Sequence, residues 1–347
     1  MGGNALSIRA CGLRRSLLRP VALALLMLAS GPGAAPQYLS SALEPQSRVG
    51  IGQIGFTGRC VKPHNALLYL PPRPLCQVAG PQGAESRRVP KTFLDMKPAE
   101  LAKQVPELKH LDSANSQDML PMILQRVGAT VADFFDNFSN TTCKERVIST
   151  VDTPLQTLTY RVEFNYLALV KPGTDKTRLQ EYRTDSKGEQ VKLRGIVVTA
   201  GFVTLAAYFH PNDQRGSRFR YLGRELVKGQ STYVLAFAQR PGVARQAGWV
   251  ASDDKGTFVF AQGVAWVDPT SFRILRLRTD IQQPESDVGL QRETTEVEYS
   301  EVTFPRGGKT LWLPREVTVS GELNKYIFRN RHLYSDYRLF AVRSRIL

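Results

Sequence analysis

Few side chains in this sequence are placed for covalent or acid–base chemistry, and each has a structural alternative. Cys143 stands beside Lys144 and Glu145, and a neighbouring cation lowers the pKa of a thiol and activates it as a nucleophile. The sequence places no histidine near it, so a buried thiol at a helix–strand junction is the stronger interpretation. His210 follows an apolar segment and precedes Pro211, which favours a helix C-cap over a catalytic base.

Paired carboxylates are the other candidates for acid–base chemistry. Asp253 and Asp254 come directly before a Lys-Gly pair, which is more typical of a hairpin turn than of an active site. A second group of acids lies close together near the C-terminus: Glu293, Glu296, Glu298 and Glu301. Glu296 and Glu298 share the solvent-facing side of a predicted strand, and no facing acid is evident at the separation that a glycosidase needs. We therefore expect no catalytic residue, and a hydrolase of unknown substrate is the weakest of the alternatives.

The cysteines and histidines do not form a metal-binding pattern. The sequence has no Cys-x-x-Cys and no His-Glu-x-x-His motif, and its four histidines are scattered: His64, His110, His210 and His332. We expect no metal site and no cofactor. Cys60 and Cys76 flank a proline-rich loop, and they either form a disulfide in an oxidising compartment or remain reduced. The sequence leaves both alternatives open.

Residues 1–35 have the features of a secretory signal peptide. Four arginines precede an apolar run of about nine residues, Val21–Ala29, and small residues follow it. A membrane-spanning helix needs about 20 apolar residues, so this run is too short to be one. We expect cleavage near residue 35, release into the periplasm or the medium, and no transmembrane segment in the mature chain. Arg14-Arg15 also fits a twin-arginine signal, which leaves the export route open.

Residues 36–90 are predicted to form a flexible arm rich in proline and glycine. Ten of the 21 prolines lie between residues 31 and 98, and Pro71-Pro72-Arg73-Pro74 favours an extended, polyproline-like segment. The glycines that begin at Gly50 suggest a phosphate-binding loop, but the lysine and the strand–turn–helix context of such a loop are missing. We interpret this stretch as a spacer.

Residues 91–145 are predicted to be mainly helical. Pro98 fits the first turn of one helix, and a second helix is predicted to begin near Pro121. Apolar residues then recur at steps of three and four and form one stripe: Met122, Ile123, Val127, Val131, Phe134, Phe135 and Phe138. The stripe indicates either a helix packed on a sheet or a lid over an apolar cavity.

Residues 146–347 show the pattern of a β-sheet domain. Apolar and polar residues alternate in stretches 158–166, 296–300 and 317–323, which predicts strands with one buried face. Glycine-containing turns separate about nine to eleven such strands, and Gly201–His210 interrupts them as a short helix closed by Pro211. Short connections favour antiparallel pairing. We therefore expect an α+β fold, with a large, curved, mostly antiparallel sheet packed against the amphipathic N-terminal helices.

The net charge of +15, from 46 basic and 31 acidic residues, needs its own explanation. The arginines concentrate in two clusters, Arg215, Arg218, Arg220 and Arg224, and then Arg329, Arg331, Arg338, Arg343 and Arg345. No nucleic-acid-binding motif accompanies them, and predicted export argues against nucleic acid as a partner. An anionic envelope surface is one hypothesis, and a merely solvated basic surface is the other.

Several short phrases carry a family resemblance, among them Leu120-Pro121-Met122-Ile123, Asp133-Phe134-Phe135-Asp136-Asn137, Ala265-Trp266-Val267-Asp268 and Tyr334-Ser335-Asp336-Tyr337. Together they resemble a family of uncharacterised secreted proteins of the Acidobacteria over roughly residues 97–347. That family brings no known activity. The strand that holds Gly263 and Trp266, followed by Phe272-Arg273-Ile274, is also similar to the half-barrel of the LolA and LolB lipoprotein carriers.

The resemblance to these carriers implies a half-barrel that shelters acyl chains between a curved sheet and helices. We therefore hypothesise an exported, non-enzymatic envelope protein that binds a lipid or another apolar ligand inside the curve of the sheet. The residues expected to contact it are Phe134, Phe135, Phe138 and Trp266. A structural or protein-interaction module with a filled core is the alternative.

Overall fold

The computed structural model describes residues 52–55, 91–170, 179–189, 201–244, 246–252, 255–305 and 308–340. The predicted signal peptide lies outside the described residues, and so does the predicted arm apart from residues 52–55. Cys60, Cys76, Asp253 and Asp254 lie outside them as well. The disulfide alternatives and the exact form of the Asp253-Asp254 turn therefore stay predictions.

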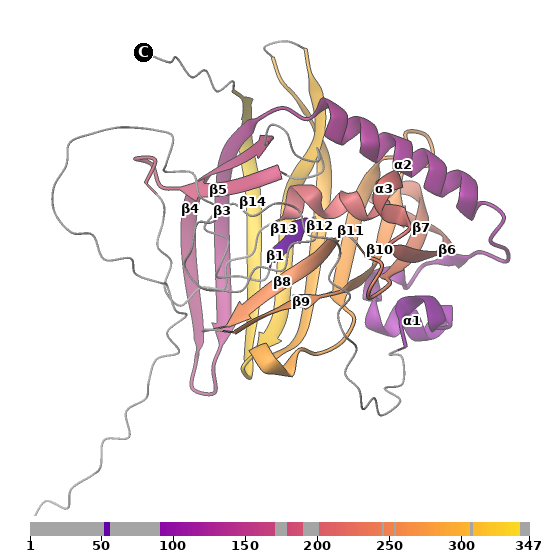
Figure 1. The fold of residues 1–347 in the computed structure, drawn as a ribbon, viewed down its shortest axis with the longest axis horizontal. Helices are drawn as coiled ribbons and strands as arrows, with labels where there is room; N and C mark the ends of the chain where they lie inside the picture. The colour runs from indigo at the N-terminus through magenta and orange to yellow at the C-terminus, as the bar shows by residue number, and fades with distance from the viewer. Residues whose placement is uncertain are drawn as a thin grey trace, which may run out of the picture.

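A large curved sheet dominates the described part of the chain (Figure 1). Its eleven strands lie in the order β2-β6-β7-β10-β11-β12-β13-β14-β3-β4-β5, and every pairing is antiparallel. The strands are β2 (Asp112–Ser113), β3 (Thr141–Asp152), β4 (Thr157–Val170), β5 (Leu179–Thr184), β6 (Ser217–Val227), β7 (Gln230–Gln239), β10 (Ala261–Val267), β11 (Ile274–Ile281), β12 (Leu290–Thr303), β13 (Thr310–Leu323) and β14 (Tyr326–Leu339). The predicted curved antiparallel sheet is confirmed.

Helices precede and interrupt this sheet. They are η1 (Phe93–Asp95), α1 (Pro98–Gln104), η2 (Pro106–Leu108), α2 (Leu120–Asn137), η3 (Phe202–Phe209), α3 (Pro211–Gln214) and η4 (Ser286–Val288). The two predicted helices are α1 and α2, and each carries a proline in its first turn, where a missing N–H costs nothing. The segment predicted to be a helix closed by Pro211 is the 3-10 helix η3, and Pro211 instead begins α3.

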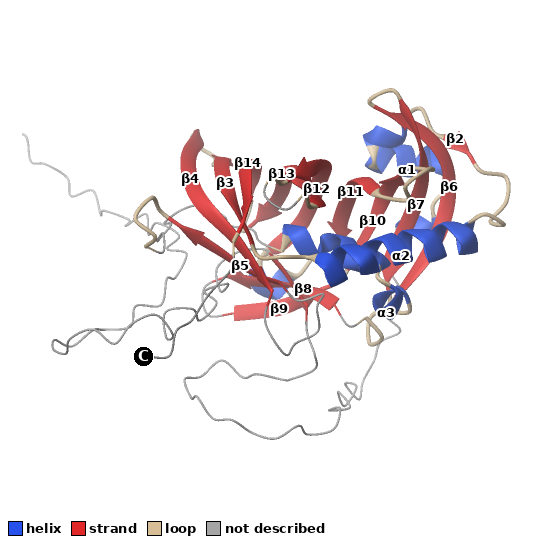
Figure 2. Cartoon of the chain, turned by 90° about the horizontal axis from the view of Figure 1, so that it is seen from above, coloured by secondary structure: helices blue, strands red, loops and turns tan. Residues whose placement is uncertain are grey.

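The helices lie on both faces of the sheet (Figure 2). We call the face that carries α2 and η3 the inner face and the opposite one the outer face. A small antiparallel sheet of β1 (Gly52–Gly55), β8 (Gln246–Ser252) and β9 (Lys255–Val259) lies on the same side as α2. The short helix α1 lies on the outer face, near β6, β7 and β10.

Two hydrophobic clusters correspond to these two layers. The inner cluster joins α2 and η3 to alternate residues of the sheet, such as Leu277, Val297 and Val317. The outer cluster is smaller and consists of Phe93, Met96, Leu101, Val105, Leu108, Leu222, Val234, Ala236, Val264 and Trp266. Strands β7 and β10 contribute to both clusters, so in β10 all seven residues are buried. The half of the sheet near β6 is therefore covered on both faces.

Two glycines on the sheet allow aromatic rings to lie across neighbouring strands. A Cβ atom at Gly263 would lie 2.7 Å from the ring of Phe237, and one at Gly321 would lie 2.8 Å from the ring of Phe328. Both distances are shorter than any side chain tolerates, because van der Waals contact begins near 3.5 Å. Glycine at these two positions is therefore a packing requirement of the inner layer.

The boundary between helices and sheet differs from the prediction. Residues 91–145 were predicted to be helical, but β3 begins at Thr141, and Asp112–Ser113 already pairs with β6. The first residues of β3 belong to the sheet because they pair with β4 on one side and with β14 on the other. The alternation predicted at residues 158–166 and 317–323 is confirmed by the burial of Phe164, Tyr166, Val317 and Val319.

Candidate functional site

The apolar stripe of α2 faces the inner side of the sheet. Phe135 is only 2% exposed and Phe138 is buried, whereas Phe134 is partly buried at the margin of the inner cluster. The ring of Phe134 makes edge-to-face contacts with Phe135 at 5.1 Å and with Phe138 at 5.4 Å between centroids. The structure therefore brings three of the four predicted ligand-binding residues together.

His210 connects this stripe to the neighbouring helices. It ends η3, where its backbone N–H bonds to the Ala207 carbonyl, so the predicted helix C-cap is confirmed. It also begins α3, because its Nδ1 accepts a hydrogen bond from the Asn212 backbone N–H at 3.2 Å. Its ring lies 6.1 Å from that of Phe135. These contacts give His210 a structural role beside α2.

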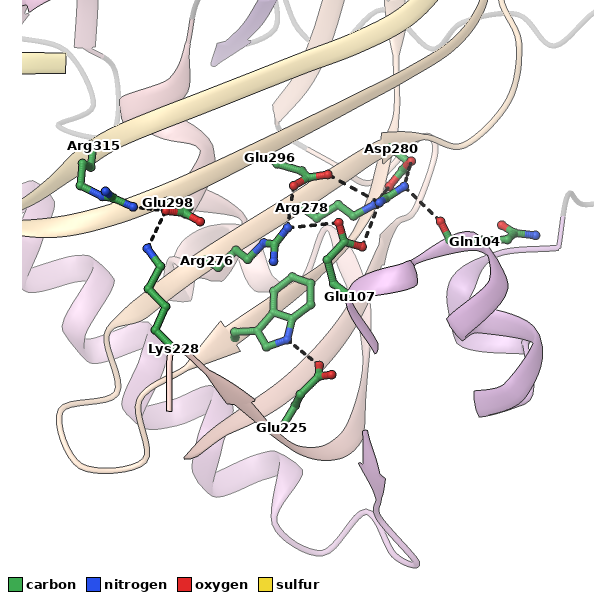
Figure 3. Close-up of polar contacts among 11 residues, drawn as sticks. Gln104, Glu107, Glu225, Lys228, Arg276, Arg278, Asp280, Glu296, Glu298 and Arg315 are labelled. Carbon is green, nitrogen blue, oxygen red and sulfur yellow. Dashed lines mark hydrogen bonds and ion pairs between the residues drawn. The ribbon is translucent and has the colours of Figure 1, made fainter. Parts of the chain in front are cut away.

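Trp266 lies on the other face of the sheet, away from the three phenylalanines. It is 1% exposed and belongs to the outer cluster with α1. Its indole Nε1 donates a hydrogen bond to Glu225 at 3.0 Å, and the Arg276 guanidinium lies 5.1 Å from the ring centroid (Figure 3). The prediction that Trp266 shares a site with the phenylalanines is therefore wrong. Successive residues of a strand point to opposite faces, and Ala265 and Val267 take the inner side here.

An ion-pair network beside Trp266 fastens the N-terminal helices to the outer face (Figure 3). Glu107 of η2 bonds to Arg276 at 3.1 Å and to Arg278 at 3.2 Å. Arg276 also bonds to Glu296 at 2.6 Å, and Arg278 bonds to Asp280 at 2.9 Å. Burial, together with the neighbouring Glu107 carboxylate, raises the pKa of Glu296. The acids of this network are thus paired with arginines, which argues against a role for them in acid–base catalysis.

The first arginine cluster, residues 215–224, also helps to attach the N-terminal helices to the outer face. Arg220 donates to the carbonyls of Leu94 and Met96 at 3.2 and 2.7 Å, and Arg218 lies 3.7 Å from Asp95. In the second cluster Arg331 pairs with Glu316 at 2.6 Å, while Arg343 and Arg345 lie outside the described residues. Arg218, Arg220 and Arg331 are thus engaged in contacts within the fold.

A buried polar network on the inner face was not found by sequence reasoning. Glu145 on β3 is 0% exposed, and its carboxylate accepts two hydrogen bonds from Arg183 of β5 at 2.5 and 2.9 Å. His332 Nδ1 lies 2.8 Å from the same carboxylate, and the Tyr334 hydroxyl donates to it at 2.9 Å. Burial alone would raise the pKa of Glu145, but the Arg183 charge and the His332 hydrogen bond outweigh it and lower the pKa to about 2.

Glu181 and Cys143 lie next to this network. Glu181 of β5 accepts a hydrogen bond from the Gly201 backbone N–H at 2.7 Å, which joins the sheet to the start of η3. Cys143 is a buried free thiol, and burial together with the nearby Glu145 carboxylate raises its pKa. A thiol with a raised pKa carries little thiolate, so the hypothesis of a nucleophilic Cys143 finds no support.

Three buried polar atoms on β3 and β12 have no hydrogen-bond partner among the described residues. They are Ser149 Oγ on β3, and Glu293 Oε2 and Tyr299 OH on β12. All three lie on the side of their strands that also carries buried apolar residues, such as Val147 beside Ser149 and Val297 beside Tyr299. Native cores rarely leave such groups unpaired, because each costs about 1–3 kcal/mol. These three atoms, on strands that β13 and β14 separate in the sheet, mark the inner face as the candidate site.

Within the described ranges, no group of three or more His, Cys, Asp or Glu side chains is placed to hold a metal ion. Over the same residues, no helix combines the length and the apolar character that crossing a membrane requires.

No protein-family profile matches the chain, and no curated protein matches it. Solved structures that resemble it include a DUF1329 family protein from Desulfovibrio piger, at 12% identity and a TM-score of 0.33 over 65% of this chain and 95% of that one. A LolA superfamily protein from Nitrosomonas europaea follows, at 13% identity and a TM-score of 0.28 over 63% and 94%. Lipoprotein LppX of Mycobacterium tuberculosis resembles it at 12% sequence identity and a TM-score of 0.22, over 62% of this chain and 95% of that one. The acidobacterial resemblance stays a prediction.

Proposed function

We propose that this protein binds an amphiphilic ligand, with a lipid or acyl chain as its apolar part, on the inner face of its curved sheet. The observation that carries the proposal is the presence of unpartnered buried polar atoms, Ser149 Oγ, Glu293 Oε2 and Tyr299 OH, among the apolar residues of the inner layer. A core that is filled only by protein normally pairs such atoms within itself. An amphiphile supplies hydrogen-bonding groups for them and apolar surface for their neighbours.

The helix α2 is the element that we expect to cover the ligand. It is a separate layer on the inner face (Figure 2), in contact with η3 and α3. Its Phe134 lies at the margin of the inner cluster. A partly buried aromatic ring can change its contacts at less cost than one that is fully buried. Phe134, Phe135 and Phe138 therefore remain the proposed contact residues, and Trp266 is withdrawn.

The proposal also includes a place in the cell. The arginine-flanked apolar run within residues 1–35 supports export, and an exported lipid-binding protein acts in the periplasm or outside the cell. We propose a binding function and not an enzymatic one. The raised pKa of Cys143 and the ion pairs around Glu296 support that choice.

The test is a fluorescence titration of the purified mature protein with N-phenyl-1-naphthylamine, a probe that brightens in apolar surroundings. We expect a saturable rise that added dodecanol reverses. Phe134→Ala should weaken probe binding several-fold, whereas Trp266→Phe, an aromatic substitution on the outer face, should leave it unchanged. A protein that stays folded by circular dichroism yet gives no saturable rise would contradict the proposal.

A structural or protein-interaction module is the second candidate. It is favoured by the Glu145 network, because a carboxylate that is bonded to Arg183, His332 and Tyr334 holds three strands together without any ligand. The same titration separates the two functions, since a filled inner layer has no room for the probe.

A further inference from the structure

Glu293 holds a buried carboxylate oxygen that has neither a hydrogen-bond donor nor a cationic partner among the described residues. Its Oε1 accepts a hydrogen bond from the Thr295 hydroxyl at 3.3 Å, and its Oε2 is buried without a partner. Glu145, by contrast, is bonded to Arg183, and Glu107 is bonded to two arginines. An acid that is buried in this way either stays protonated or needs a donor from elsewhere, because the desolvation of its charged form is otherwise uncompensated.

The surroundings of Glu293 are apolar on the side of β13 and β14. Its partner across β13 is Gly321, over which the ring of Phe328 from β14 lies. On β11 the nearest charged group is Asp280, whose carboxylate is already bonded to Arg278 and to the Thr294 hydroxyl. Asp280 repels a charge on Glu293 and offers it no hydrogen bond. The geometry thus leaves one buried carboxylate oxygen without a donor from the described residues.

We propose that Glu293 binds the head group of the ligand, and that this head group is a hydrogen-bond donor of the primary-amine type. The proposal rests on the proposed function, since it assigns one end of the same ligand. The apolar chain would lie along the inner layer, and the ammonium group would pair with Glu293 Oε2. An anionic head group is disfavoured here, because Asp280 repels it, and so does Glu293 once it is ionised.

Burial, with a smaller contribution from Asp280, raises the pKa of Glu293 to about 8. The free protein therefore holds a neutral carboxyl group here at pH 7. An ammonium head stabilises the carboxylate form, so the proton of Glu293 passes to the buffer when the amine binds. The affinity for the amine should therefore increase as the pH rises from about 6 to about 8. Gly321 and Phe328, on the neighbouring strands, carry no charge that would add to this dependence.

The experiment measures displacement of N-phenyl-1-naphthylamine by three ligands with the same chain: dodecylamine, dodecanol and dodecyl sulfate. For the wild type at pH 8, we expect dodecylamine to act at a concentration about tenfold lower than dodecyl sulfate, the effect of one charge-assisted hydrogen bond. In Glu293→Gln this preference should fall to near unity. The control is Glu301→Gln, which removes an exposed carboxylate paired with Arg273, and it should behave as the wild type.

A second measurement needs no variant. Calorimetric titration with dodecylamine in two buffers of different ionisation enthalpy should detect release of close to one proton at pH 7. Displacement without any amine preference, or a preference that persists in Glu293→Gln, would overturn the head-group assignment and leave the proposed function intact. Absence of saturable probe binding in the wild type would overturn both.

Discussion

The side-chain amide of Gln117 pairs with the backbone of Tyr221 in the way that a neighbouring strand would. Gln117 Oε1 accepts from the Tyr221 N–H at 2.8 Å, and Gln117 Nε2 donates to the Tyr221 carbonyl at 2.8 Å. Beside it, the Ala114 N–H donates to the Leu222 carbonyl at 2.8 Å, and β2 pairs with Gly223 and Arg224. The edge of the sheet at β6 is thus closed by one side chain and a two-residue strand, which blunts its tendency to pair with another chain.

Gln117→Ala should open this edge. We expect a loss of about 1–2 kcal/mol in the free energy of unfolding, because two hydrogen bonds to backbone groups are lost. Urea denaturation gives the change, and hydrogen exchange should show faster exchange of the Tyr221 amide. Gln125→Ala, at an exposed position of α2, is the matched control and should change neither quantity. Unaltered exchange at Tyr221 would contradict the strand-like role.

Two tyrosines of the inner face should respond in opposite ways to removal of their hydroxyl groups. The Tyr334 hydroxyl bonds to Glu145, so Tyr334→Phe should cost about 1–3 kcal/mol of stability. The Tyr299 hydroxyl has no partner among the described residues, so Tyr299→Phe should be neutral or stabilising in the ligand-free protein. Thermal unfolding of the two variants checks the contrast. A large loss for Tyr299→Phe would show that this hydroxyl is paired after all.

Glu145 should contribute to the acid limb of the stability curve. Its pKa is lowered to about 2 in the folded protein from an ordinary value of 4.5, so its contribution is present above pH 4.5 and is lost as the pH falls towards 2. The contribution is on the order of 3 kcal/mol. Urea unfolding of Glu145→Gln and the wild type between pH 7 and pH 3 should therefore show a difference that shrinks with acid.

The control for this comparison is Glu163→Gln. Glu163 pairs with Arg146 on the solvent-exposed face of the neighbouring strand, where an ion pair adds less than about 1 kcal/mol. A pH-independent difference between Glu145→Gln and the wild type would mean that the network stabilises through packing alone.

Truncation of the phenylalanines of α2 should give graded losses. Phe135 is almost fully buried and contacts Phe134 and His210, so Phe135→Ala should cost about 3–5 kcal/mol. Phe134 lies at the margin of the cluster, so Phe134→Ala should cost less than half as much. Denaturant titration of both variants checks the order. Equal losses would indicate that α2 is plain core and not a cover.

The sequence predicts a strand well where one face of the strand is exposed to solvent, and poorly where both faces are buried. Alternation is clear in β4 and β13, whose outer faces are open to solvent. In β10 every residue is buried, so no alternation tells which face receives Trp266. The helix α1 that covers the outer face there is far from β10 in sequence, and its position follows only from the tertiary fold.

The polar part of the candidate site was beyond sequence reasoning for a similar reason. Glu145 meets Arg183, His332 and Tyr334, which lie 38, 187 and 189 positions further along the chain. Glu293 was noted as one of several acids, but its sequence neighbours are polar and give no sign of burial. A pattern that could have helped is the placement of Glu145 and Glu293 on the apolar side of their strands.

The neighbours of β14 in the sheet determine when the fold can be completed during synthesis. This strand is the last described segment of the chain, yet it lies between β13 and β3, the first long strand of the sheet. Until residues 326–339 emerge, β3 and its hairpin partner β4 lack their link to the strands from β6 to β13. Until then the nascent chain therefore has two unpaired sheet edges, β3 and β13. A truncation within β14 would leave those edges exposed permanently and favour aggregation over a shortened native fold.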